Sequence, residues 1–175
     1  VLALPKCRGV CARIAGPLYE RPEFVEAWGQ SVRDALAKFP LGARVHLLFS
    51  AHAIPAGRGG ADGAAYAKEV AESARLIADQ LDNARITSVA YQSRAPWGRW
   101  TGPRIEQELE RLGKAGVRNC LIVPISFLYD NVETWCDIDM EIIPRAADFG
   151  MTRIMRATPP LESPHLLEAL IKLSV

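Results

Sequence analysis

Three carboxylates, Glu133, Asp137 and Glu141, follow one another at intervals of four residues in the segment CLIVPISFLYDNVETWCDIDME. On an α-helix, which advances about 100° per residue, this spacing places them on one broad face. The segment begins with an apolar run from Leu121 to Val123 that is typical of a buried strand. Because hard and borderline cations prefer carboxylate oxygens, the row is a candidate metal site. A solvated acidic helix face is the alternative.

Length and composition limit the classes of protein that the sequence fits. The 175 residues make one domain, 1–175, and the net charge is +1 with acidic and basic residues interspersed. Without a stripe of Lys and Arg, the sequence predicts no nucleic-acid partner. No apolar run approaches the roughly 20 residues of a membrane span, and no signal peptide is visible. We therefore expect a cytoplasmic protein.

The four cysteines are too few for a disulfide scaffold in a chain of this length. Cys7 and Cys11 form a CxxxC pair that has no second pair downstream. This pattern favours ordinary half-buried thiols over a metal or cluster site, and the sequence does not predict an iron–sulfur cluster. The role of this pair stays open.

Helical periodicity alternates with short β-rich runs along the chain. Apolar residues at helical spacing predict helices over 22–39, 64–81 and 103–116, a fourth in the acidic segment and a last one after Ser163. Strands are predicted over 10–15, 44–50, 86–91, 121–123 and 153–155. The alternation predicts an α/β fold, a doubly wound, mostly parallel sheet with helices on both faces.

Three groups with chemical potential directly follow predicted strands: His52, the loop with Trp97 and Trp100, and the turn over 130–133. Ligands of such sheets bind beyond the carboxyl ends of the strands, so we expect the three groups to gather along one edge. The GxSxG signature of a hydrolase is absent, and zinc hydrolysis would call for more histidines at this edge. An imidazole, carboxylates and tryptophans fit metal handling beside a flat apolar ligand.

Four segments in order carry a resemblance to a known family: LYERPEFVEAW (18–28), HLLFSAHAIP (46–55), YQSRAPWGRWTGP (91–103) and VPISFLYDNVETWCDIDME (123–141). In these segments, which span nearly the whole chain from about Cys11 onward, the sequence resembles the carboxyl-terminal half of the ferrochelatases. The members of that family insert ferrous iron into a porphyrin in haem biosynthesis. The resemblance implies a chelatase-like, Rossmann-like domain.

The resemblance also implies a role for individual residues. His52 and Glu133 match the catalytic histidine and glutamate, and with Asp137 and Glu141 they are the expected metal contacts. The acidic row would then lie on an inner helix that in the family is often a π-helix. The expected porphyrin-binding residues are Trp100, Ser93, Gln92 and Phe127. Ferrous iron and porphyrin would be the substrates and partners, without an organic cofactor.

Two features depart from the family pattern. Asn131 stands where the family has a histidine two residues before the glutamate, and an amide cannot act as a base. The chain also has no counterpart of the family's amino-terminal domain, except for an apolar run at residues 1–4.

Three explanations of the length stay open. The chain could be part of a two-domain enzyme, a half-size homodimeric chelatase for another metal and tetrapyrrole, or a non-catalytic haem- or porphyrin-binding module. Protoporphyrin IX and coproporphyrin III are both open as substrates, and so is peripheral contact with a membrane.

Overall fold

A four-stranded parallel sheet forms the centre of the computed structural model, which describes residues 15–56, 61–81 and 86–174. Its strands lie in the order β2-β1-β3-β4, and each neighbouring pair is parallel. The strand bounds are β1 (His46–His52), β2 (Thr87–Gln92), β3 (Asn119–Val123) and β4 (Arg153–Arg156).

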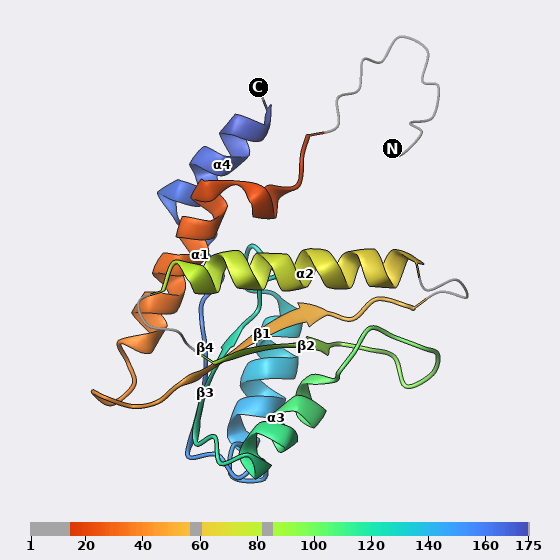
Figure 1. Cartoon of the computed structure of the whole chain (residues 1–175), viewed down its shortest axis with the longest axis vertical. Helices are drawn as coiled ribbons and strands as arrows, with labels where there is room; N and C mark the ends of the chain where they lie inside the picture. The colour runs from red at the N-terminus through yellow and green to blue at the C-terminus, as the bar shows by residue number, and fades with distance from the viewer. Residues whose placement is uncertain (1–14, 57–60, 82–85, 175) are drawn as a thin grey trace.

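Helices cover both faces of this sheet (Figure 1). One core joins it to α1, α2 and α4, and a second core joins its other face to α3 and η2. This arrangement confirms the predicted α/β fold. The bounds are η1 (Leu18–Glu20), α1 (Pro22–Leu36), α2 (Ala61–Asp79), α3 (Ile105–Lys114), η2 (Glu133–Ile142), η3 (Ile143–Arg145) and α4 (Pro164–Ser174).

Successive residues of β1 supply the two cores in turn. Leu47 and Phe49 belong to the core that contains Trp28, whereas Leu48 belongs to the core that contains Leu109. All five side chains are fully buried. Side chains alternate between the faces of a strand, so a central parallel strand is apolar on both faces and reads as a continuous hydrophobic run.

The connections of the strands reverse direction between β1 and β3. The chain passes from β1 through α2 to β2 on one side of β1, and then returns through α3 to β3 on the other side. The segments that leave β1 and β3 therefore separate toward opposite faces. Ligands of doubly wound sheets bind at such a reversal of strand order. His52 ends β1, so it lies at this point.

Most predicted elements are found within a few residues of their expected bounds. The main difference is η2, which is a π-helix where the periodicity in itself predicts an α-helix, although the family resemblance allowed for it. Cys7, Cys11, the apolar run at 1–4 and all but the last residue of the predicted strand over 10–15 lie outside the described residues. Within the part that is described, no helix is long and apolar enough to cross a membrane.

His46, buried at the start of β1, predicts a pH-dependent stability. Its Nε2 lies 2.8 Å from Ser88 Oγ, and its Nδ1 has no hydrogen-bond partner among the described residues. Burial lowers the pKa of His46 below the ordinary 6.5. The unfolded chain therefore binds a proton more readily than the native protein does. The free energy of unfolding should fall as pH drops below about 6.5 toward the lowered native pKa.

Denaturant titrations between about pH 7.5 and pH 5.5 check this expectation, because the ordinary histidine pKa lies inside this range. His46→Gln should flatten the dependence on pH, whereas the exposed control His165→Gln should leave it as in the parent chain. Equal slopes for the parent and His46→Gln would contradict the prediction.

Candidate functional site

His52 is held at the end of β1 by contacts from two other segments. Its backbone N–H donates to Ser126 Oγ at 3.0 Å, and its carbonyl accepts the Tyr66 hydroxyl at 2.9 Å. Burial raises the pKa of Tyr66 to about 12, so its hydroxyl stays a proton donor at neutral pH. The backbone of His52 is thus fixed from α2 and from the turn after β3, while 37% of its side chain remains exposed.

The ring of His52 has a defined tautomer when it is neutral. Its Nδ1 lies 2.7 Å from the carbonyl oxygen of Ala53, and a carbonyl can only accept, so Nδ1 carries the hydrogen. The lone pair is then on Nε2, which lies 3.8 Å from Glu133 Oε1. This distance is too long for a direct hydrogen bond. The two groups are therefore close to each other without a direct hydrogen bond. The lone pair of Nε2 is left available to accept a proton.

Asn131 caps the helix that carries Glu133. Its Oδ1 accepts the backbone N–H of Glu133 at 2.9 Å and that of Thr134 at 3.0 Å. Asparagine is among the preferred residues for this task, because its short side chain reaches the free N–H groups of the first turn. Asn131, whose amide cannot act as a base, thus fixes the backbone at Glu133.

Removing this cap should destabilise the protein. Asn131→Ala is expected to lower the free energy of unfolding by about 1 kcal/mol, since the two N–H groups lose their acceptor. Asn131→Asp keeps the acceptor and should stay close to the parent chain. Urea unfolding of the two variants makes the comparison, and equal stability of the Ala and Asp variants would contradict the capping role.

Asp137, one turn after Glu133, is joined to the loop that follows β2. The hydroxyl of Ser93 donates to its carboxylate. Ser93 has a φ of 61°, a left-handed conformation that few residues other than glycine adopt. Such outliers cluster at functional sites, where the surrounding structure holds them in place. Ser93 is therefore held in a conformation in which its hydroxyl orients Asp137, a member of the acidic row.

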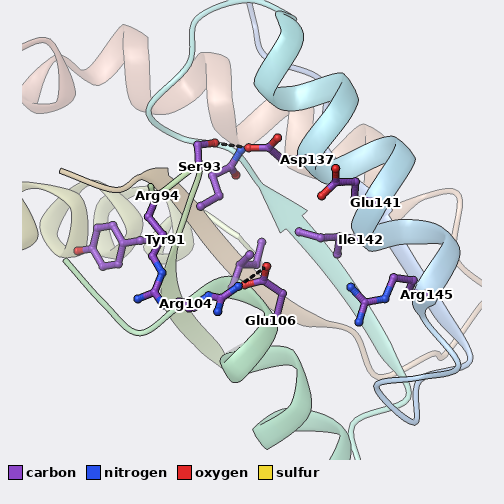
Figure 2. Close-up of a pocket in the computed structure, with 11 residues that line it drawn as sticks. Tyr91, Ser93, Arg94, Arg104, Glu106, Asp137, Glu141, Ile142 and Arg145 are labelled. Atoms are coloured by element: carbon purple, nitrogen blue, oxygen red, sulfur yellow. Dashed lines mark hydrogen bonds and ion pairs between the residues drawn. The ribbon is translucent and has the colours of Figure 1, made fainter. Parts of the chain in front are cut away.

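A small pocket of about 180 Å³ lies between η2 and the segment from the end of β2 to the start of α3 (Figure 2). Asp137 and Glu141 face it from η2, and it is also lined by three arginines, Arg94, Arg104 and Arg145. It is smaller than a typical site for a drug-sized molecule, so it suits a hydrated ion or a very small ligand. The three arginines come from separate segments, so no motif in the sequence indicates that they meet.

Aromatic rings flank His52 and the loop after β2. The Phe127 ring meets the His52 ring edge-on, with the centroids 6.4 Å apart and the planes at 70°. Trp100 is half-buried, and its Nε1 donates to the carbonyl of Trp97 at 2.7 Å. Trp97 is 75% exposed. An isolated bridge between Pro55 and Trp100 ties this loop to the segment after β1. Of the two tryptophans of this loop, Trp97 is thus the exposed one.

Gln92 is buried, with 3% of its surface exposed. Its Oε1 accepts the hydroxyl of Ser50, and its Nε2 lies 3.5 Å from the carbonyl oxygen of Glu133. The side chain thus links β1 to the first residue of η2. It also reaches the wall of the small pocket. A ligand contact of Gln92 stays a prediction.

The structure gathers the predicted residues in two neighbouring groups. His52, Glu133 and Phe127 form one, and Ser93 and Asp137 form the other, with Glu141 in the same pocket wall. Within residues 15–56, 61–81 and 86–174, no three His, Cys, Asp or Glu side chains converge as a ready metal site. A metal bound here would need ligands beyond these side chains. Tyr66 and Ser126, which no motif indicates, support the site through hydrogen bonds to the backbone of His52.

Comparison with known proteins places the chain in a family. The ferrochelatase family profile matches residues 6–175. A ferrochelatase from Nostoc punctiforme is 31% identical over 171 residues, which cover 98% of this chain and 44% of that protein. The chain thus spans less than half the length of this curated relative.

Two solved structures share the fold. SirB from Bacillus subtilis with Fe³⁺ matches with a TM-score of 0.59 and 13% identity, over 91% of this chain and 55% of that one. A putative cobalamin biosynthesis CbiX protein from Marinobacter aquaeolei matches with a TM-score of 0.50 and 23% identity, over 74% of this chain and 93% of that one. At these identities the likeness shows the fold alone. The family profile, with the four motifs and the relative, establishes that the chain belongs to the ferrochelatase family.

Proposed function

We propose that the chain forms one wall of a porphyrin site and inserts ferrous iron into the macrocycle, as a ferrochelatase. The observation that carries this proposal is the pair formed by His52 Nε2 and Glu133 Oε1, 3.8 Å apart at the carboxyl edge of the sheet. Membership of the family supports the same reading.

The chemistry requires a proton acceptor beside a metal ligand. The two pyrrole N–H groups of the porphyrin must lose their protons before a metal can take their place. Because Nδ1 of His52 is bound to the Ala53 carbonyl, Nε2 is the available base, and the carboxylate of Glu133 is a second acceptor within reach. Carboxylate oxygens also replace the water ligands that ferrous iron must lose. The division of these roles between His52 and Glu133 stays open.

Asp137 and Glu141 extend the site away from His52. Both line the small pocket, so they are placed to receive iron or the released protons. The hydroxyl of Ser93 orients the Asp137 carboxylate. We assign metal contact to His52, Glu133, Asp137 and Glu141 as a path of successive ligands, since the described side chains form no closed cage.

Aromatic side chains near the pair would hold the macrocycle. Phe127 lies edge-on to His52, and Trp100 is anchored through Trp97 in the neighbouring loop. Flat aromatic ligands stack on such side chains. Ser93 and Gln92 would border the ring from the end of β2. The substrate is protoporphyrin IX or coproporphyrin III, and the available side chains do not favour either.

The opposite wall of the site must come from elsewhere, because a stacked macrocycle needs two walls. It would be supplied by the remaining half of a longer enzyme or by a second copy of this chain. The half-size homodimeric chelatase, for another metal and tetrapyrrole, is the second candidate function. The match covers 93% of the CbiX protein, so the same fold occurs in a chain of similar length. The non-catalytic haem- or porphyrin-binding module is the third. A cytoplasmic location with peripheral membrane contact stays an expectation.

Anaerobic incubation with ferrous iron and each porphyrin tests the proposal. The absorption spectrum should change from that of the free porphyrin to that of the iron porphyrin faster than in buffer alone. Tight porphyrin binding without metalation would instead support the binding module. Turnover with another metal and tetrapyrrole alone would support the half-size chelatase. Sedimentation at the assay concentration shows whether two copies are present.

A further inference from the structure

A buried guanidinium joins the last strand to the helix that carries the acidic row. Arg156 ends β4, and 9% of its side chain is exposed. Its Nε and Nη2 each donate to an Asp139 carboxylate oxygen at 2.8 Å, and its Nη1 donates to Asp130 Oδ1 at 2.6 Å. Fork-shaped pairs of this kind are geometrically specific as well as strong. None of the three residues was predicted as a catalytic, metal-binding or porphyrin-binding residue.

The charge of this group is maintained inside the fold. Burial acts to lower the pKa of Arg156, but the adjacent carboxylates of Asp139 and Asp130 outweigh it, and the pKa is raised. Asp130 also accepts the hydroxyl of Thr134 at 3.2 Å. Arg156 is therefore tied, through Asp130, to the residue next to Glu133.

Asp139 lies six residues after Glu133 on η2, whereas Asp130 lies before the helix and is not part of its turns. At about 4.4 residues per turn, six residues of a π-helix turn by about 490°. At 3.6 residues per turn, six residues of an α-helix turn by about 600°. With Glu133 held by its cap, conversion of η2 to an α-helix would therefore rotate Asp139 by about 110° around the helix axis, away from Arg156.

The register in turn decides which way the acidic row faces. Groups four residues apart are offset by about 33° in a π-helix and by about 40° in an α-helix, but in opposite directions. With Glu133 held by its cap, Asp137 would be displaced by about 70° and Glu141 by about 145° on conversion to an α-helix. Glu141 would leave the pocket wall, and Ser93 could no longer orient Asp137.

We propose that Arg156 is a positioning residue that locks η2 in its π register and so aims Glu133, Asp137 and Glu141 at the site. The lock is a property of the fold, and only its effect on turnover rests on the proposed function. Thr134, Ile138 and Ile142, each next in sequence to a residue of the acidic row, are buried, so apolar packing is the competing explanation for the same register.

The structure of Arg156→Met tests the lock without iron or porphyrin. In the parent, the N–H of Ile143 donates to the carbonyl of Ile138, a bond across five residues that marks the π register. A crystal structure, or hydrogen-bond couplings measured by NMR over residues 133–143, should show bonds across four residues in the variant. Retention of the five-residue bonds with Asp137 still on Ser93 would overturn the proposal.

A second variant separates the lock from the cost of unpaired buried carboxylates. Arg156→Met combined with Asp130→Asn and Asp139→Asn removes all three charges together, so it should fold even where the single variant does not. It is expected to lose the π register as well. Retention of the register in this triple variant would mean that apolar packing sets it, which overturns the proposal. Arg156→Lys offers a point charge in place of a fork and should restore the register only in part.

Turnover provides an independent readout in an assembly that inserts iron. Arg156→Met should lower kcat by about 10- to 100-fold, because small displacements of catalytic groups have effects of this size. The KM for porphyrin should stay within about threefold, since Arg156 does not touch the aromatic residues of the site.

The control is Arg153→Met, which should change neither value. Arg153 is an exposed arginine of β4 whose guanidinium donates to the Lys38 carbonyl. Loss of porphyrin affinity with kcat unchanged would contradict the positioning role. If the protein does not insert iron, the structural test of the helix register in Arg156→Met still applies.

Discussion

Glu133→Gln is expected to lower the kcat for iron insertion by at least about 100-fold, the usual scale for the loss of a proton-transferring group. The amide keeps the size of the side chain and cannot accept a pyrrole proton or supply a carboxylate oxygen to iron. His52→Ala should cause a loss of similar size, because it removes the free Nε2. The initial rate of iron porphyrin formation under anaerobic conditions measures both.

The combination of the two changes is the sharper test. His52 and Glu133 face each other across 3.8 Å, so the double variant should be little slower than the slower single variant. Losses that multiply would show that the residues act independently and would contradict a shared proton-transfer role. Glu110→Gln, an exposed carboxylate of α3, is the matched control and should leave the rate unchanged.

Gly113→Ala should destabilise the fold by about 3 kcal/mol or more, which is at the upper end of the usual cost of overpacking. Gly113 lies in α3, where the chain after η3 passes directly over it. A Cβ at this position would overlap the carbonyl oxygen of Phe149 and lie 2.9 Å from its carbonyl carbon. Because the obstacle is backbone, α3 or the segment around Phe149 would have to shift. Denaturant unfolding measures the loss.

Gly29→Ala is the control for this effect. Gly29 is also helical, in α1, but a Cβ there would meet the ends of the Gln80 and Arg33 side chains, at 3.1 Å and 3.3 Å. These groups can move, and alanine is favoured over glycine in a helix by about 1 kcal/mol. Gly29→Ala should therefore be neutral or stabilising. A Gly113→Ala variant as stable as the parent chain would show that the close approach to Phe149 is not maintained in solution.

The order and type of most elements could be predicted from the sequence, because each strand and each amphipathic helix has its own periodicity. The position of His52 also followed, since a residue directly after a strand must lie at the carboxyl edge of a parallel sheet. The four motifs then indicated Glu133 and its acidic row. Comparison establishes the family that these motifs indicated, whereas the roles of Glu133 and its row stay predictions.

The π register could not be read from the spacing of the acidic residues. Groups four residues apart align almost equally well in either helix, with offsets of about 33° and about 40°. The residue to which we attribute the π register is Arg156, which comes from β4 and contacts Asp139 of η2 only in the folded chain. The sequence offered one sign of this contact, because Arg156 is a charged residue at the carboxyl end of a predicted strand.

Burial was a second property that the motifs did not reveal. Gln92, whose contact with the porphyrin stays a prediction, is buried, and its side chain lies between Ser50 and the Glu133 carbonyl oxygen. Asn131 looked like a departure from the catalytic pattern and proved to be a helix cap. In both cases a side chain near the site supports the backbone of Glu133, a role that depends on local geometry and not on residue type alone.

A structure of the protein with a bound metal-free porphyrin would show whether His52 and Glu133 face the reacting nitrogens. We expect the macrocycle to lie at the carboxyl edge of the sheet, with its pyrrole nitrogens facing His52 Nε2 and the Glu133 carboxylate and with Phe127 at its rim. A porphyrin bound elsewhere, or one whose nitrogens face away from both residues, would contradict it.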